Sequence, residues 1–319
     1  MDRERAVVCA GILVADHVCT PMQALPEPGR LVAVDKMYLL TGGCAANVAV
    51  NVAKQSISVG VLGKVGDDPW GRFVREDLGR HGVDTKRIGV SPEAQTSQSM
   101  VLLCRGEDRR FVHTFGANGE LRAADIPTDY LAGAQVFYLG GYLIMPSLVP
   151  GELAGVFRCC RERGIRTVLD VVVPTGFHYN GELDEVLRST DVFLPNVDEA
   201  EALTGEKDPA RQAAALHAMG AGTVVVTMGE AGLFFANATG AWRASHFNSE
   251  VVDQTGAGDA FCAGFIAGMV RGLDLAGCIR YGSALGASCV RSIGCYEGVF
   301  TAEQAHTFLE THALEIERV

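Results

Sequence analysis

The sequence has few basic residues, and its cysteines lack the spacing of a metal site. Lys and Arg number 27 against 38 Asp and Glu, which gives a formal net charge of −11. A chain this acidic lacks the basic surface that binding to a phosphate backbone requires, so we exclude nucleic acid as a partner. Its 10 cysteines form no CxxC pair and no Cys/His cluster with zinc spacing. Most stand among Val, Ala and Gly, so we expect buried thiols in a reducing cytoplasm.

Long apolar runs are also missing. No window approaches the roughly 18–20 apolar residues that cross a bilayer, so we expect no contact with a membrane. The apolar run at 6–14 is interrupted by Gly11 and followed by Asp16 and His17, which argues against a signal peptide. Hydrophobic residues still make up 48% of the 319 residues, which is enough for a large core and excludes a disordered chain. Because we find no repeat and no long linker, we expect one domain over residues 1–319.

Short β-branched runs alternate with helical patterns along the chain. The predicted strands are 7–13, 59–65, 136–139, 167–173, 192–194 and 223–227. The predicted helices are 45–54, 71–81, 148–163, 182–188, 210–219, 258–271, 275–289 and 302–311. In the first helix, Ala45, Val48, Ala49 and Val52 repeat at helical spacing on one face. This alternation predicts an α/β fold with a doubly wound, mainly parallel, Rossmann-like sheet.

Two segments break the alternation. Residues 14–40 hold three prolines and show no helical period, and residues 100–115 are typical of two strands around a turn at 105–108. We expect both segments to form antiparallel strands that stand off the main sheet as a small lid. The exposed edge of such a sheet favours pairing with a second copy, so we also expect a homodimer through the lid.

The most specific motif is Asp-Gln-Thr-Gly-Ala-Gly-Asp at 253–259, which runs directly into a helical pattern. A glycine-rich turn that opens a helix presents unpaired N–H groups at the positive end of the helix dipole, which is a site for an anion. Asp259 falls in the first helical turn beside that site. This pairing suits phosphoryl transfer, because the amides stabilise the transferring group while the carboxylate accepts the hydroxyl proton. The helix dipole is expected to make Asp259 a weaker base, which matters little in a loose transition state.

With this motif and a second glycine-rich one, the sequence resembles the ribokinase-like (PfkB) carbohydrate kinases. Residues 253–259 resemble the second signature of that family, and Gly-Gly-Cys-Ala-Ala-Asn-Val-Ala at 42–49 resembles the first. Further matches follow in the family's order: Gly11 with Asp16, Val-Gly-Asp-Asp at 65–68 with Gly71, Gly-Ala-Asn at 116–118, Asn196 with Glu199, and Thr-Met-Gly-Glu-Ala-Gly at 227–232. The resemblance implies a kinase that uses ATP and Mg²⁺, with a small sugar or sugar acid as the acceptor.

The resemblance also implies a role for each matching residue. Asp259 would be the base, and Gly256, Ala257 and Gly258 would form the anion hole. Asp16, Gly43 and Asn47 would hold sugar hydroxyls. Asn196 and Glu199 would lie near Mg²⁺ and the phosphates, and Thr227, Gly229 and Gly232 would border the nucleotide. Asp253 and Thr255 resemble the family's site for a monovalent cation such as K⁺.

Structural alternatives remain for several of these residues. Asp16 also suits a turn, Asn47 also suits a solvated helix face, and Asn196 with Glu199 also suits a helix N-cap. Two departures from ribokinase itself leave the sugar open. Cys44 stands where ribokinase has Lys, and Leu-Gly-Gly-Tyr at 139–142 replaces a segment that carries a substrate-binding Glu.

Other functions would need residues that differ from these motifs. The first strand is not followed by the GxGxxG motif of a dinucleotide-dependent oxidoreductase. Gly63-Lys64 is not preceded by the glycine-rich segment of a P-loop, which argues against a P-loop kinase. A nucleoside kinase would need stacking aromatics, for which the candidates are Tyr38, Phe111, Phe115 and Tyr142. A sugar phosphate would need a basic cluster, for which the candidates are Arg105, Arg109 and Arg110. A non-catalytic regulator of the same fold is the remaining alternative.

Overall fold

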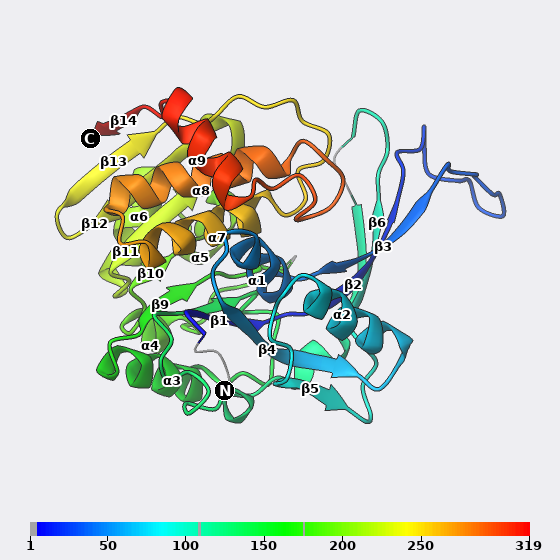
Figure 1. The fold of residues 1–319 in the computed structure, drawn as a ribbon, viewed down its shortest axis with the longest axis horizontal. Helices are drawn as coiled ribbons and strands as arrows, with labels where there is room; N and C mark the ends of the chain where they lie inside the picture. Colours follow the sequence, from blue (N-terminus) through cyan, green and yellow to red (C-terminus); the bar gives the residue numbers. More distant parts are fainter. Residues whose placement is uncertain (1–4, 108–109, 175) are drawn as a thin grey trace.

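A computed structural model describes residues 5–107, 110–174 and 176–319. It contains a ten-stranded sheet in the order β14-β13-β12-β11-β10-β9-β8-β1-β4-β5 and a four-stranded sheet in the order β3-β2-β6-β7 (Figure 1). The strands of the large sheet are β1 (Val7–Gly11), β4 (Val59–Gly66), β5 (Ile88–Ser91), β8 (Val136–Gly140), β9 (Arg166–Leu169), β10 (Val192–Phe193), β11 (Thr223–Thr227), β12 (Leu233–Asn237), β13 (Gly240–Ala244) and β14 (Ile316–Arg318).

The large sheet is doubly wound. The chain enters at β1, proceeds to β4 and β5 on one side, and returns to β8, β9, β10 and β11 on the other, all in parallel. The direction of winding therefore reverses between β1 and β8, where Gly11 pairs with Gly140. A Cβ atom at Gly11 would lie 2.0 Å from the Gly140 carbonyl oxygen, so only glycine permits this approach. Ligands of such sheets bind beyond the carboxyl ends of the strands at this reversal.

Helices cover both faces of the large sheet. One face packs against α1 (Cys44–Lys54), α2 (Pro69–Arg80), α7 (Ala257–Val270), α8 (Leu275–Cys289) and α9 (Ala302–Thr311). The other packs against α3 (Pro150–Glu162), α4 (Asp184–Leu187), α5 (Val197–Thr204) and α6 (Pro209–Ala218). Successive strand residues alternate between these two cores, as Val7 and Val8 do in β1. Among the described residues, every helix is too short or too polar to span a membrane.

The small sheet stands apart from the large one, at the right of Figure 1. It contains β2 (Val14–Cys19), β3 (Met37–Gly42), β6 (Gln98–Leu102) and β7 (Arg110–Thr114). The prediction of a separate small sheet from these two segments is confirmed. The strands pair antiparallel within each segment, as predicted, whereas the two segments meet through the parallel pair β2 and β6. They are joined through α1, β4, α2 and β5 rather than by a tight turn, whereas β2–β3 and β6–β7 are antiparallel. Of the predicted turn, Asp108 lies outside the described residues, as does Arg109.

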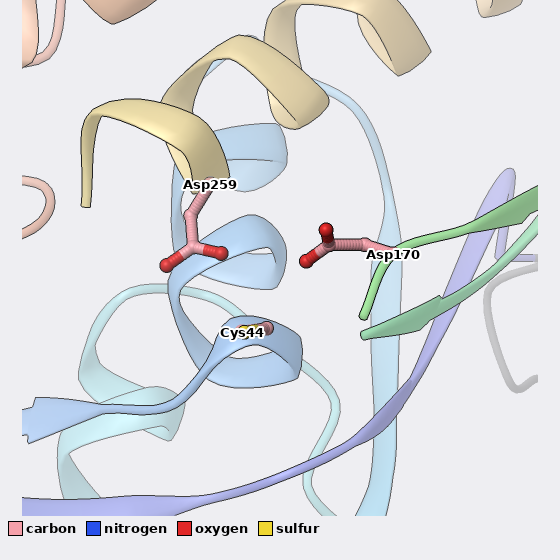
Figure 2. A group of neighbouring side chains, drawn as sticks. All are labelled: Cys44, Asp170 and Asp259. Carbon is pink, nitrogen blue, oxygen red and sulfur yellow. The ribbon is translucent and has the colours of Figure 1, made fainter. Parts of the chain in front are cut away.

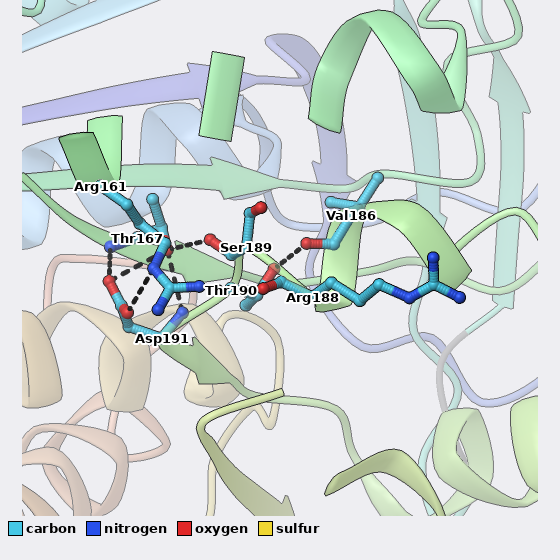
Figure 3. Close-up of polar contacts among 7 residues, drawn as sticks. All are labelled: Arg161, Thr167, Val186, Arg188, Ser189, Thr190 and Asp191. Carbon is cyan, nitrogen blue, oxygen red and sulfur yellow. Dashed lines mark hydrogen bonds and ion pairs between the residues drawn. The ribbon is translucent and has the colours of Figure 1, made fainter. Parts of the chain in front are cut away.

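Asp191 forms hydrogen bonds that connect the amino ends of β9 and β10 (Figure 3). Asp191 Oδ2 accepts from the Thr167 N–H at 2.8 Å, and the Asp191 N–H donates to Thr167 Oγ1 at 2.9 Å. Arg161 of α3 lies 3.5 Å from Asp191 Oδ1 and also donates to the Arg188 carbonyl. These contacts fix the position of β9 along the sheet. The strand predicted over 167–173 is β9, which ends at Leu169. The next residue, Asp170, therefore lies at the opposite, carboxyl edge of the sheet.

Candidate active site

The amino end of α7 forms a turn that only glycine can make. Gly256 precedes the helix with φ 78°, and a Cβ atom there would lie 2.6 Å from Cys295 Cβ. Ala257, Gly258 and Asp259 are the first three helical residues. N–H groups of a first turn have no carbonyl partner within their own helix, and they point along its axis. A Cβ atom at Gly258 would meet nothing within 4 Å, so the space beside this turn is open.

The carboxylate of Asp259 lies beside α1. Asn47 Nδ2 donates to Asp259 Oδ2 at 2.8 Å, and the Cys44 thiol donates a second hydrogen bond. Burial raises the pKa of Asp259, while these two hydrogen bonds act in the opposite direction. Burial outweighs them, so the pKa of Asp259 lies above its ordinary value.

Asp170, which the sequence analysis did not single out, faces this carboxylate. Figure 2 shows Cys44, Asp170 and Asp259 converging from α1, the end of β9 and α7, with their ligand atoms within 4.8 Å of one another. Tyr138 OH donates to Asp170 Oδ2 at 3.1 Å. Burial and the charges of Glu199 and Asp259 raise the pKa of Asp170 well above its ordinary value. The signal that could have identified Asp170 is its place directly after a buried parallel strand next to the reversal in winding.

The residues predicted to border the nucleotide gather beyond β10 and β11. Asn196 is the N-cap of α5; its Oδ1 accepts from the Glu199 N–H at 2.9 Å, and Glu199 Oε2 accepts from the Asn196 N–H at 2.9 Å. The N-cap alternative therefore describes the local structure. Burial raises the pKa of Glu199 to about 7, and the charge of Asp259 adds to this. The backbone of Asn196 forms an isolated parallel β-bridge with Thr227 at the end of β11. Gly229 (φ 56°) and Gly232 (φ 82°) lie in the turn that follows, before β12.

Two of these carboxylates fit a divalent cation. Asp170 and Glu199 offer oxygen ligands of the kind that Mg²⁺ prefers, and the charges of Glu199 and Asp259 raise the pKa of Asp170. Cys44 does not belong to that donor set: burial holds its pKa well above the ordinary value, and a neutral thiol is a poor ligand for Mg²⁺.

The residues predicted to hold the acceptor reach the same site from the small sheet and α1. Asp16 lies in β2 rather than in a turn, and Gly42 makes room for it, since a Cβ atom at position 42 would lie 1.8 Å from Asp16 Oδ2. Burial raises the pKa of Asp16 to about 6, and the charge of Asp259 contributes. Gly43 (φ 92°) caps α1. Asn47 is 3% exposed, which excludes a solvated role, and its Oδ1 is buried without a partner among the described residues.

Asp253 and Thr255 form the turn that leads into Gly256. Asp253 Oδ1 accepts from both Thr255 N (2.9 Å) and Thr255 Oγ1 (2.7 Å), and Oδ2 accepts from Gly294 N at 3.3 Å. Both carboxylate oxygens thus stabilise the loop. A monovalent cation at this turn stays a prediction.

The described candidate aromatic and basic residues lie in different surroundings. Phe111 and Phe115 are about half exposed, whereas Tyr142 is buried with its OH donating to the Glu182 carbonyl. Arg110 forms an ion pair with Glu107 of the same hairpin. The ten cysteines are free thiols, and all but Cys44 and Cys159 are buried, as expected.

Comparisons with known proteins identify the family. The family model of pfkB family carbohydrate kinases matches residues 4–302. The chain is 26% identical over 311 residues to a ribokinase of Haemophilus influenzae, covering 96% of this chain and 99% of the relative. It is 31% identical over 258 residues to fructoselysine 6-kinase of Escherichia coli, covering 80% and 92%. The structure of Arabidopsis thaliana ribokinase complexed with ribose and ATP superposes with a TM-score of 0.82 at 24% identity, covering 97% and 99% of the two chains. The chain therefore belongs to the pfkB family of carbohydrate kinases.

Proposed function

We propose that this kinase transfers the γ-phosphoryl group of ATP to a hydroxyl of a small sugar or sugar acid, with Asp259 as the base. The observation that carries the proposal is the position of Asp259. It lies in the first turn of α7 beside an open glycine turn, and it accepts a hydrogen bond from Asn47 at 2.8 Å. Anion-binding amides, a carboxylate and the candidate acceptor-binding residues thus meet at one point, where the winding of the sheet reverses.

In the proposed reaction the acceptor hydroxyl oxygen attacks the γ-phosphorus. The bond to the β,γ-bridging oxygen breaks, and the hydroxyl proton passes to Asp259. The N–H groups of Gly256, Ala257 and Gly258 stabilise the charge on the transferring group. The dipole of α7 was expected to weaken the base. Burial acts the other way and raises the pKa of Asp259, which makes the carboxylate a better proton acceptor.

The remaining predicted residues suit the part of the site that would bind the phosphoryl donor, ATP. Asn196, Thr227, Gly229 and Gly232 would border the nucleotide, and Glu199 with Asp170 would hold Mg²⁺. When bound, the ion neutralises charge on the phosphate oxygens. We also place a monovalent cation at Asp253 and Thr255, whose turn leads directly into the anion hole.

We further propose a single domain over residues 1–319 that works as a homodimer in the cytoplasm. The small sheet supports pairing, because its outer strands β3 and β7 each have one neighbouring strand and leave an edge open. Ten free thiols support a reducing compartment.

The test is ADP release from MgATP over a panel of pentoses, hexoses, ketoses, sugar acids, sugar phosphates and nucleosides. We expect turnover with an unphosphorylated sugar or sugar acid, because Arg110, one of the candidates for a phosphate-binding cluster, is paired with Glu107. Faster turnover of a sugar phosphate or a nucleoside than of every sugar in the panel would contradict the proposal.

A further inference from the structure

Three side chains that can bind a metal ion converge at the amino end of α7. They are Cys44 at the start of α1, Asp170 directly after β9, and Asp259 in the first turn of α7 (Figure 2). The Cys44 sulfur and one carboxylate oxygen of each aspartate all lie within 4.8 Å of one another. Ligand atoms of a tetrahedral zinc site are roughly 3–4 Å apart, so small side-chain rotations are enough to close this set around an ion.

A further oxygen atom beside Asp259 has no partner. Asn47 follows Cys44 by three positions, so the two side chains lie on one face of α1. Asn47 Nδ2 donates to Asp259 Oδ2 at 2.8 Å, and Oδ1 of the same amide group is buried without a hydrogen-bond partner among the described residues. Buried polar atoms are usually hydrogen-bonded, so this oxygen indicates a place for a ligand or an ion next to the carboxylate.

An ion can reach the three side chains from solvent. Cys44 and Asp259 are partly exposed, whereas Asp170 is buried. A Cβ atom at Gly258 would meet nothing within 4 Å, so the space beside the first turn of α7 is open. Binding of a cation therefore requires no rearrangement of the backbone.

The sulfur atom determines which cation this group prefers. Mg²⁺ takes oxygen ligands in octahedral geometry, and a protonated thiol is a poor ligand for it. Zn²⁺ instead accepts sulfur and carboxylate ligands together in a tetrahedral arrangement. A thiol that binds Zn²⁺ loses its proton, which is released to water. Cys44 therefore makes this group a better site for Zn²⁺ than for Mg²⁺.

We propose that Cys44, Asp170 and Asp259 form an inhibitory site for Zn²⁺, a thiophilic divalent cation, with Asn47 Oδ1 as a fourth ligand. The inhibitory role rests on the proposed function. Bound Zn²⁺ occupies the carboxylate oxygens of Asp259, which then cannot accept the hydroxyl proton. It also withdraws Asp170 from Mg²⁺. The site therefore holds either the reactants with Mg²⁺ or Zn²⁺, and the kinase is inactive in the second state.

The first test measures metal binding without turnover. Co²⁺ is a spectroscopic substitute for Zn²⁺, and a bond between Co²⁺ and a thiolate gives a charge-transfer absorption band in the near ultraviolet. Wild-type protein should show this band with Co²⁺ and lose it when Zn²⁺ is added. Asp170→Asn should weaken Co²⁺ binding by at least about 10-fold, because loss of even an indirect partner of a metal costs 10–100-fold.

Two cysteine variants identify the thiol. Cys44→Ser should lack the band. Cys159→Ser is the matched control and should keep it, because Cys159 is the other cysteine that is not buried, and it lies in α3 on the opposite face of the large sheet. Circular dichroism verifies that each variant is folded. A band that persists in Cys44→Ser, or its absence from the wild-type protein, would overturn the inference.

The second test is inhibition of phosphoryl transfer by buffered free Zn²⁺ at saturating MgATP. Each variant is compared with its own activity without Zn²⁺. Wild-type protein and Cys159→Ser should lose activity and regain it with a zinc-selective chelator. Cys44→Ser should need at least about 10-fold more free Zn²⁺ for half inhibition, since a direct ligand is lost. Equal inhibition of Cys44→Ser and wild type would overturn the inhibitory role.

The two tests separate the metal site from the proposed function. If no acceptor in the panel is phosphorylated while the Co²⁺ band depends on Cys44, the proposed function fails and the metal site stands. If an acceptor is phosphorylated and the band is absent, the metal site fails and the proposed function stands.

Discussion

Replacement of Asn47 by Ala should move the pH dependence of catalysis. In the wild-type protein, Asn47 Nδ2 donates to the charged form of Asp259 at 2.8 Å. This bond lowers the pKa of a carboxyl group that burial raises. Loss of the donor removes stabilisation from the ionised form only, so the pKa of Asp259 must rise. A hydrogen bond to a charged group contributes about 1.5–3 kcal/mol, and about 1.4 kcal/mol corresponds to one pKa unit, so the expected rise is about 1–2 units.

The assay is kcat against pH at saturating acceptor and MgATP. Since the ionised carboxylate is the proposed base, the acidic limb of the profile should shift to higher pH by about 1–2 units in Asn47→Ala. Asn47 is also predicted to hold a hydroxyl through its unpartnered Oδ1, so KM should rise in the same variant. Because kcat is measured at saturating acceptor, this increase in KM does not alter the pH profile.

Asn51 provides a matched control. It lies one turn further along α1 and is fully buried, and its Nδ2 donates to the Cys295 carbonyl at 3.0 Å. Asn51→Ala therefore loses a comparable buried hydrogen bond without touching Asp259. Both variants should be destabilised, but only Asn47→Ala should change the profile. An unshifted acidic limb in Asn47→Ala, or an equal shift in Asn51→Ala, would refute the assignment of Asp259 as the titrating base.

Four further outcomes are expected. Asp259→Asn keeps the size of the side chain but removes the base, so kcat should fall by about 10²–10⁴-fold with little change in acceptor affinity; near wild-type kcat in a folded variant would overturn the mechanism. Asp16→Asn should act mainly on the KM of the acceptor, raising it roughly 10–150-fold, and a larger effect on kcat than on KM would contradict its role in binding. Asp191→Ala removes the acceptor of the Thr167 N–H in β9, so the free energy of unfolding measured in urea should fall by about 1–3 kcal/mol while the KM for ATP stays unchanged. Wild-type stability of this variant would show that the contacts in Figure 3 do not hold the strand. Hydrogen exchange in residues 14–40 and 100–115 should slow when acceptor is added, and unchanged exchange at saturation would exclude closure of the small sheet.

Local patterns were sufficient to predict much of the main sheet and the α7 turn. Strand 223–227 and helices 275–289 and 302–311 have the predicted bounds, because turn and capping residues mark their ends. Short strands such as β5 and β14 were missed, since four or three residues carry too little periodicity to be recognised.

Features that depend on distant parts of the chain were not predictable in the same way. The bond between Asn47 and Asp259 joins residues 212 positions apart, so the helical period of α1 identifies a polar face but not its partner. Asp170 becomes part of the site only because β9 lies beside β8 in the sheet. The parallel pairing of β2 with β6 likewise follows from the path of the chain between them, which neither strand's sequence reveals.

That parallel pairing has a consequence for the order in which the molecule folds. His17 of β2 and Gln98 of β6 are in contact although 81 positions separate them, so closing this pair requires the whole intervening α/β unit to be compact first. Asp16 arrives with the first segment of the small sheet, and β6 and β7 arrive with the second. During synthesis, therefore, β2 lacks its neighbour on this side until β6 has emerged, and the small sheet forms after the α1–β4–α2–β5 unit that separates the two strands.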